Sequence, residues 1–180
     1  MSPVGLRRAL HVASAAVLLP ALRSDTALRL ALLWVAVFAA LVEFARLASP
    51  RVERWLGAHL PVYRLRETRR ASGALWLAFG YAAAGWLPLP APVAGILAGA
   101  LADPAASWVG ARCGSGARKS WAGSGAAFLV TVATTVAVGA APATALAAGL
   151  VGAALERWSG PIDDNLLVAP GVAATVALLA

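Results

Sequence analysis

The feature that most constrains this chain is a succession of apolar segments separated by short polar ones. A helix needs about 20 apolar residues to cross roughly 30 Å of hydrocarbon. With 61% hydrophobic and only 13% charged residues, we expect an all-α integral membrane protein. It would be a polytopic bundle of about seven transmembrane helices that forms one domain over residues 1–180. The expected spans are residues 9–22, 27–47, 71–88, 91–102, 122–139, 142–155 and 166–180.

Two of these spans are short. Residues 9–22 would extend over only about 21 Å as a helix. A signal peptide has the same basic start and short apolar core, but another apolar segment follows at once and no small-x-small cleavage site is present. The run 91–102 has 12 residues, so we expect this helix to stop inside the protein, where a water-filled cavity begins.

The distribution of charge predicts an orientation. With a cytoplasmic N-terminus, thirteen of the fifteen Lys and Arg residues fall on the cytoplasmic side, as the positive-inside rule requires. Seven of the eight acids fall there too, although acids contribute little to orientation. We therefore expect a multi-pass protein of a bacterial or archaeal-type plasma membrane, with its active site on the cytoplasmic face. Basic loops explain the net charge of +7, so no nucleic acid partner is expected.

Residues 48–70 differ from the apolar segments around them. Eight charged residues, six of them arginines, alternate there with Trp55, Leu56, Leu60 and Tyr63. A basic stretch with interleaved apolar residues is typical of an amphipathic segment that lies on a membrane surface. We therefore expect an interfacial basic segment near 48–70.

The polar segment 101–125 combines an acid, three cations and five glycines. Glycine lets the main chain approach a ligand closely, so that successive N–H groups converge on an anion, while Arg and Lys supply positive charge. The segment therefore predicts a polyphosphate site. A mobile cytosolic loop whose cations merely orient the protein has the same composition, and this alternative stays open.

A second polar segment, residues 156–165, contains the adjacent carboxylates Asp163 and Asp164, followed by Asn165. Mg²⁺ is usually held by one or two carboxylates together with substrate phosphates. A helix N-cap before residues 166–180 would explain one acid. The second acid, together with Asp103 and Glu156 on the same side, favours metal or phosphate chemistry.

Several short motifs follow one another along the chain. They are Arg7-Arg8-x-x-His11; Glu43-x-x-Arg46; Arg64-x-x-Glu67 followed by Ser72-Gly73-Ala74; Asp103-Pro-x-Ala-x-x-x-Gly110; Lys119-Ser120-x-x-Gly123-Ser124; and Glu156 with Asp163-Asp164-Asn165. This ordered set resembles the membrane-bound CTP-dependent lipid kinases, which comprise dolichol kinase, phytol kinase and the yeast-type diacylglycerol kinase. The resemblance covers nearly the whole chain.

The resemblance implies transfer of the γ-phosphoryl group of CTP, with Mg²⁺ or a similar divalent cation, to the hydroxyl of a membrane lipid. The lipid would be a polyprenol or dolichol, phytol or another isoprenoid alcohol, or diacylglycerol. The catalytic carboxylates would be Asp103, Glu156, Asp163 and Asp164, and the metal ligands among them Asp103, Asp163 and Asp164. The nucleotide and phosphate ligands would be Arg112, Arg118, Lys119, Ser120, Gly123, Ser124 and Asn165. The supporting residues would be Arg8, His11, Glu43, Arg46, Arg64 and Glu67.

Some of these residues also have simpler explanations. A lone His such as His11 in an apolar helix is more often a hydrogen-bonded packing residue, and Glu43, Glu67 and Glu156 could be partners of nearby arginines at a membrane surface. Either Asp103 or Glu156 could orient the lipid hydroxyl, and the spacing does not choose between them.

Three alternative functions remain. Phosphatidate cytidylyltransferase, a related enzyme, also handles CTP in a membrane, but its H-G-G-x-x-D-R-x-D stretch is absent, since the only histidines are His11 and His59. A transporter would carry polar residues near the bilayer midplane, whereas the mid-span residues are almost entirely Ala, Leu, Val and Gly. An assembly subunit without chemistry gives no reason for the acidic pair and the glycine-rich cationic segment to coexist.

Overall fold

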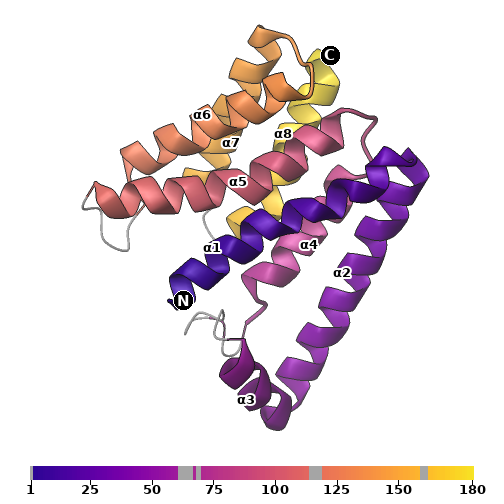
Figure 1. Cartoon of the computed structure of the whole chain (residues 1–180), viewed down its shortest axis with the longest axis vertical. Coiled ribbons are helices and arrows are strands. Elements are labelled where there is room, and N and C mark those ends of the chain that lie inside the picture. Colours follow the sequence, from indigo (N-terminus) through magenta and orange to yellow (C-terminus); the bar gives the residue numbers. More distant parts are fainter. Residues whose placement is uncertain (1, 61–66, 68–69, 114–118, 159–161) are drawn as a thin grey trace.

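Residues 2–60, 67, 70–113, 119–158 and 162–180 are described by the structure, a computed structural model. These residues form helices and no strand, so the expected all-α class is confirmed (Figure 1). The elements are α1 Pro3–Ser14, the 3₁₀ helix η1 Ala15–Leu22, α2 Asp25–Ala48, α3 Pro50–His59, α4 Gly73–Ala84, α5 Ala91–Arg112, α6 Trp121–Ala137, α7 Pro142–Trp158 and α8 Asp164–Leu179.

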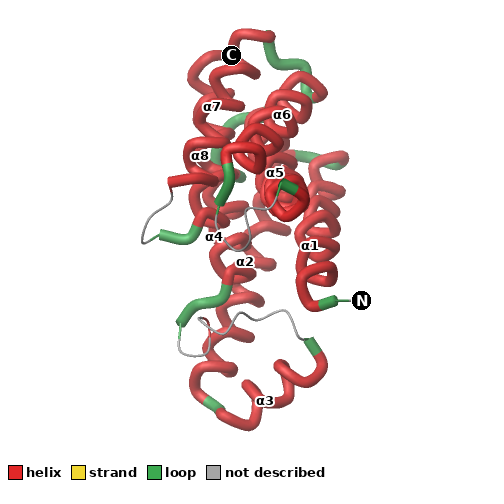
Figure 2. The backbone as a smooth tube through the Cα atoms, turned by 90° about the vertical axis from the view of Figure 1, so that its left-hand side faces the viewer, coloured by secondary structure: helices red, strands yellow, loops and turns green. Residues whose placement is uncertain are grey.

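Helix α5 is the centre of the bundle. It packs against α6, α8, α1 and α4, while α7 covers α6 and α8. Helix α2 packs on η1 and α4, and α3 follows it at the lower end of the molecule (Figures 1 and 2). Small residues allow the central helices to approach closely. At Gly95 on α5, for example, a Cβ atom would collide with the main-chain oxygen of Ala169 on α8.

Among the residues that the structure describes, three stretches are long and apolar enough to cross a membrane: Pro3–Leu22, Asp25–Ala48 and Ala91–Arg112. Helices α4, α6 and α8 are apolar but shorter. Helix α2 also exposes Trp34, Phe38 and Phe44, each more than two thirds accessible. A row of exposed aromatic side chains suits contact with hydrocarbon better than contact with water. The membrane-like helical character is therefore confirmed, and the number of seven spans stays a prediction.

The expectation that a helix ends at residue 102 is wrong. Helix α5 continues through Asp103 and Pro104 to Arg112. A proline inside a helix removes one main-chain hydrogen bond and costs about 3 kcal/mol, but this half of α5 also buries Ala102 and Ala106 against α6. Helix packing therefore overrides the local preference. Asp103 lies within a helix, and segment 101–125 begins inside α5 and ends inside α6.

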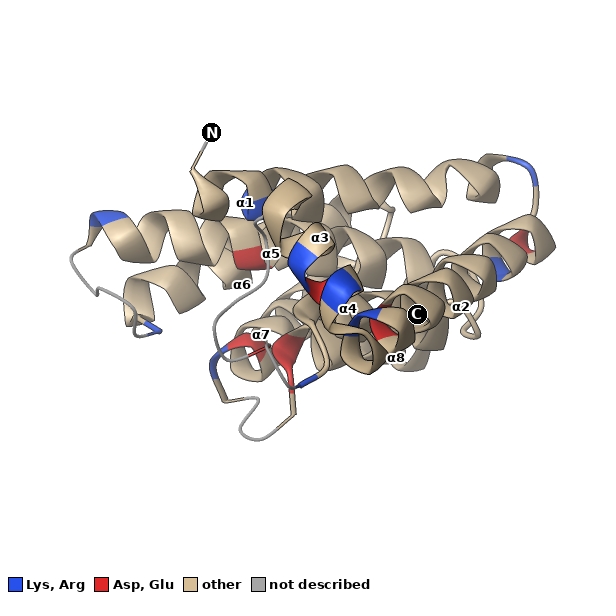
Figure 3. Ribbon diagram, turned by 90° about the horizontal axis from the view of Figure 1, so that it is seen from below, with Lys and Arg blue, Asp and Glu red and all other residues tan. Residues whose placement is uncertain are grey.

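The amphipathic character of the basic segment is seen in its first half, and its place at a membrane interface stays a prediction. Helix α3 has the expected amphipathic form, with Leu56 buried and Trp55 exposed, while residues 61–66 and 68–69 lie outside the described residues. Figure 3, seen from below, shows charged segments on α3 and near α7. The α6–α7 turn is where it was expected, and Gly139 adopts a φ of +90° there, a conformation that favours glycine.

Candidate active site

Three carboxylates from distant parts of the chain meet at one end of the bundle. Asp103 comes from the middle of α5, Glu156 from the last turn of α7 and Asp164 from the first turn of α8. Each offers an oxygen atom, and these atoms all lie within 4.8 Å of one another. A cavity of about 10 Å³ adjoins all three side chains, close to the space that one water molecule needs. We call these residues the acidic cluster.

Lys119 is the cation of the acidic cluster. Its Nζ lies 2.7 Å from Asp164 Oδ2 and 3.3 Å from Glu156 Oε1. Partial burial disfavours the ammonium, but the charges and hydrogen bonds of Asp164 and Glu156 outweigh that effect and raise the pKa of Lys119 above its ordinary value. Lys119 therefore stays charged, and it balances one of the negative charges in the cluster.

Asp163 and Asp164 have different roles at the start of α8. Asp163 is the N-cap, and its Oδ1 accepts from the main-chain N of Asn165 at 3.2 Å and from Asn165 Nδ2 at 2.7 Å. Burial and the neighbouring Asp164 raise the pKa of the Asp163 carboxyl. Asp163 therefore fits the capping interpretation, and Glu156 takes the third place in the cluster instead of Asp163.

The motif Lys119-Ser120-x-x-Gly123-Ser124 forms the start of α6. Ser120 caps the helix by accepting from Gly123 N at 3.0 Å, and a Cβ at Gly123 would lie 2.8 Å from the main-chain oxygen of Ala106 on α5. The Ser124 hydroxyl is 3.4 Å from Glu156 Oε2. Ser120 and Gly123 thus set the position of α6, and Lys119 and Ser124 contact the cluster.

Helix α1 contacts the part of α5 that carries Asp103. Arg8 donates from Nε and Nη2 to Ser107 Oγ at 3.1 and 2.8 Å, and from Nη2 to the Ser107 main-chain oxygen at 2.9 Å. One turn further along α1, His11 Nδ1 lies 3.8 Å from Asp103 Oδ2. The predicted supporting residues Arg8 and His11 therefore both face the part of α5 that carries Asp103.

Several predicted site residues lie elsewhere. Arg112 stacks on Trp108 at 3.5 Å from the ring centre, nine residues and about 14 Å further along α5 than Asp103. Glu43 and Arg46 form a buried pair at the end of α2, with 2.8 Å between Arg46 Nη2 and Glu43 Oε1. Glu67 is also buried and lines a different cavity from the cluster's own, and a Cβ atom at Gly73 would lie 3.8 Å from Glu67 Oε1 and 3.0 Å from Asn165 Nδ2. The predicted Arg64 and Arg118 lie outside the described residues.

Two residues of this region were not predicted from the sequence. Arg157 stacks on Trp121 at 3.7 Å from the ring centre and places Nη1 3.4 Å from Ser124 Oγ. Ser107 receives Arg8. The position of Arg157 directly after Glu156 was a usable signal, because the end of α7 was already expected to carry the site. No signal in the sequence connects Ser107 with Arg8, which lies 99 residues away.

The acidic cluster has the donors that a hard divalent cation requires. Three carboxylates surround a cavity of about 10 Å³, and Lys119 already shows that the site attracts positive charge. Asp103, Glu156 and Asp164 would hold Mg²⁺, which is commonly bound by carboxylates and substrate phosphates. Lys119 would then be released toward a phosphate group.

The described residues define a helical protein with membrane-length helices and a partly buried carboxylate cluster. Comparison with protein-family models, with curated proteins and with solved structures finds no match for this chain. The family resemblance of its motifs therefore stays a prediction.

Proposed function

We propose that this protein is a lipid kinase, which transfers the γ-phosphoryl group of a nucleoside triphosphate to the hydroxyl of a membrane lipid. The observation that carries the proposal is the convergence of Asp103, Glu156 and Asp164 with Lys119 at one end of a bundle of apolar helices. CTP as the donor and an isoprenoid alcohol or diacylglycerol as the acceptor follow from the family resemblance.

The residues of the cluster suit phosphoryl transfer because this reaction depends mainly on positioning and on neutralising charge. Mg²⁺, bound by the three carboxylates, would supply charge neutralisation on the phosphates. Lys119 would add a cation directed at a phosphoryl oxygen, and Arg157 stands beside Ser124 as a second cation next to Glu156. Ser124 and Lys119 hold the Glu156 carboxylate in place through its two oxygens.

The lipid hydroxyl would attack the γ-phosphorus while the bond from that phosphorus to the bridging oxygen breaks, so that a nucleoside diphosphate leaves. Asp103 is the best-placed group to orient the hydroxyl and accept its proton. It is the carboxylate of the cluster that faces α1 through His11, whereas Glu156 already contacts Lys119 and Ser124. The structure thus supports a choice between Asp103 and Glu156 that the spacing left open.

We also propose that seven spans cross the plasma membrane, with the N-terminus and the acidic cluster on the cytoplasmic face. Contacts between segments support this arrangement. Arg8, near the chain start, binds Ser107 on the second half of α5, and Lys119 binds the start of α8. All these segments carry the cations that the positive-inside rule assigns to the cytoplasm.

The proposal is tested by phosphate transfer with purified protein in detergent, γ-labelled CTP or ATP, Mg²⁺ and a panel of phytol, farnesol, a long polyprenol and diacylglycerol. We expect label in a lipid with the wild type and with Asp25→Asn, an exposed acid at the start of α2. Asp103→Asn should lose the activity. CDP-lipid formed from CTP and phosphatidic acid would indicate a cytidylyltransferase instead, and no product of either kind would overturn the enzymatic proposal.

A further inference from the structure

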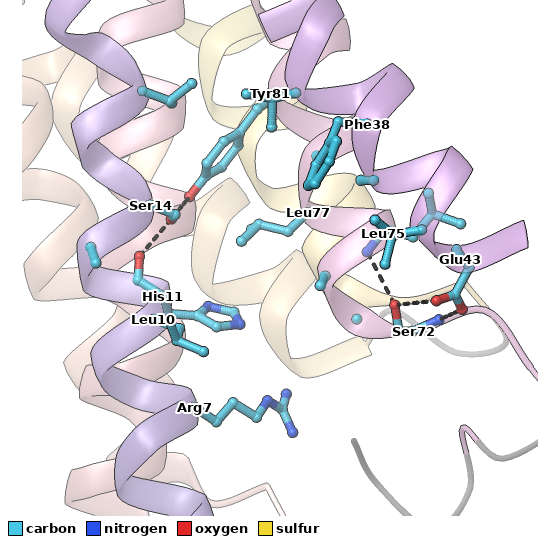
Figure 4. A pocket seen from close by; sticks show the side chains of 18 of the residues that line it. Arg7, Leu10, His11, Ser14, Phe38, Glu43, Ser72, Leu75, Leu77 and Tyr81 are labelled. Atoms are coloured by element: carbon cyan, nitrogen blue, oxygen red, sulfur yellow. Dashed lines mark hydrogen bonds between the residues drawn. The ribbon is translucent and has the colours of Figure 1, made fainter. Parts of the chain in front are cut away.

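The proposed phosphoryl transfer needs a place for the nucleoside part of the donor, and neither of two cavities provides it. The cavity at the acidic cluster, about 10 Å³, has room for little more than one water molecule. A groove of about 580 Å³ lies between α1, α2 and α4, and its mostly apolar lining extends from Arg7 past His11 to Tyr81 (Figure 4). None of the three acids of the cluster lines this groove. Among the described residues, those on the surface beside the cluster remain.

Two exposed tryptophans lie on that surface, where α6 begins and α7 ends. Trp121 is 70% exposed and Trp158 is 67% exposed, and their ring centres lie 6.2 Å apart in an edge-to-face arrangement. The Arg157 guanidinium lies 3.7 Å from the centre of the Trp121 ring, and its Nη1 lies 3.4 Å from Ser124 Oγ. Arg157 therefore holds one face of the Trp121 ring, while the high exposure of Trp121 leaves ring surface open.

Short contacts connect the Trp121 ring with the acidic cluster. Ser124 Oγ lies 3.4 Å from Arg157 Nη1 and also 3.4 Å from Glu156 Oε2, and Glu156 belongs to the cluster. One guanidinium and one hydroxyl group thus separate the Trp121 ring from a cluster carboxylate. A nucleotide whose terminal phosphates lie at the cluster can place its base at Trp121, because its ribose and first phosphate bridge a gap of this kind.

A tryptophan near a membrane surface is typical of an interfacial anchor, and Trp86 shows what an anchor alone looks like. Trp86 is 68% exposed, and the Arg29 guanidinium lies 5.9 Å from its ring centre. It precedes the start of α5, which lies about 18 Å along the helix from Asp103. Trp86 therefore has the exposure and the cation of an anchor without a nearby acidic cluster, whereas Trp121 has all three.

Glycine leaves the surface beside Trp121 uncovered. A helical side chain covers the turn on the N-terminal side of its own Cα, so a side chain at position 125 would extend toward Trp121. Gly125 is exposed, and a Cβ atom there would meet nothing within 4 Å. Glycine weakens the interior of a helix, and what it provides here is open space beside the indole.

We propose that the indole of Trp121 stacks on the base of the donor nucleotide, with Trp158 beside it and Arg157 holding the ring in place. Stacking on an aromatic side chain accepts any base, because every base has a π face. The site therefore distinguishes a nucleotide from a bare polyphosphate and does not select one base. The inference rests on the proposed phosphoryl transfer and gives its donor a second point of attachment, apart from the phosphates.

The test measures the Kd of CTP and of inorganic tripolyphosphate, each with Mg²⁺, by calorimetry on the full chain in phosphatidylcholine nanodiscs. Tripolyphosphate offers three linked phosphates without a base. We expect Trp121→Leu to weaken CTP binding by about tenfold, the size expected for one lost stacking contact, and to leave tripolyphosphate binding unchanged. Gly125→Leu should act in the same way, because its side chain covers the stacking surface. Trp86→Leu is the matched control and should change neither Kd.

An equal loss for both ligands in Trp121→Leu would overturn the inference, as would unchanged CTP binding in Trp121→Leu or Gly125→Leu, or an equal loss in Trp86→Leu. Phosphate transfer to a lipid with a nucleotide KM that Trp121→Leu and Gly125→Leu leave unchanged would overturn the stacking site and keep the kinase. CTP binding that depends on Trp121, without transfer to any lipid of the panel, would overturn the kinase and keep the nucleotide site.

Discussion

The Glu43–Arg46 pair is buried and the acidic cluster is partly buried, and their charges are balanced to different degrees. Glu43 faces one guanidinium, and its oxygens accept from Arg46 at 3.1 and 2.8 Å and from Ser72 N and Oγ at 2.7 and 3.1 Å. The acidic cluster brings three carboxylates together with one ammonium, that of Lys119, which lies 2.7 Å from Asp164 Oδ2 and 3.3 Å from Glu156 Oε1. One group is closed by its own partners, and the other carries surplus negative charge beside a cavity.

The difference shows how a structural charge pair is distinguished from a binding site. The oxygens of Glu43 are fully hydrogen-bonded, and the bond from Ser72 N joins the end of α2 to the start of α4. Such a pair has a structural role. Like charges held close together oppose folding unless a ligand balances them. The family resemblance assigned both groups to one site. The hydrogen bonds give the pair a structural role, and the cluster stays the candidate site.

The largest expected effect concerns the Glu43–Arg46 pair. Arg46→Met leaves Glu43 buried without its cation, and we expect a loss of about 3–5 kcal/mol in the free energy of unfolding. The loss is measured by denaturant titration in detergent. The double variant Glu43→Leu, Arg46→Met removes both charges and should recover much of this loss, so equal losses in the single and double variants would contradict an unpaired charge as the cause.

The next largest effect concerns the acidic cluster. Asp164→Asn and Glu156→Gln each remove one negative charge while keeping the side-chain shape, and we expect phosphate transfer to fall by about 10²–10³-fold. The unfolding free energy should hold or rise, because repulsion between carboxylates is relieved. A stability loss as large as that of Arg46→Met would show that the cluster is a second structural network and not a site.

Mg²⁺ should stabilise the protein through the acidic cluster and not through the Glu43–Arg46 pair, and this effect on stability should be smaller than the two above. A cation that binds only the folded protein stabilises it by about 2.7 kcal/mol at 100 times its Kd. We expect a rise in Tm with Mg²⁺ that EDTA reverses, in the wild type and in Arg46→Met but not in Asp164→Asn. An unchanged Tm in the wild type, or an equal rise in Asp164→Asn, would separate the cluster from metal binding.

Much of the fold could be predicted because hydropathy alone locates apolar helices. The prediction failed at Asp103-Pro104, where a helix-breaking dipeptide lies inside α5, since the packing that keeps the helix intact comes from another helix, α6, and the local sequence does not show it. The same error misplaced Arg112: in a loop it could have turned back to Asp103, but on a continuous helix it lies about 14 Å further along.

The three residues of the acidic cluster were all among the predicted site residues, but the sequence did not predict which of the acids lie together. Acids were expected at the end of α7 and at the start of α8, but which acid caps α8 depends on the backbone conformation at the helix start. In the structure Asp163 is the cap and binds Asn165, while Glu156 lies beside Asp103 and Asp164. Sequence spacing contains no information about this conformation, and none about the groove that α2 forms with α1 and α4.

The smallest predicted effect tests Ser120, which the family resemblance assigns to phosphate and the structure to a helix cap. Ser120→Ala and Ser24→Ala remove equivalent N-cap bonds, of 3.0 Å to Gly123 N and 3.1 Å to Ala27 N. Each should cost about 1 kcal/mol of stability, measured by denaturant titration. If capping is the whole role of Ser120, the two variants lower phosphate transfer per folded molecule equally little. A selective rise in KM for the nucleotide in Ser120→Ala would instead show that the Ser120 hydroxyl also contacts a phosphate. The site would then include the start of α6 as well as the acidic cluster.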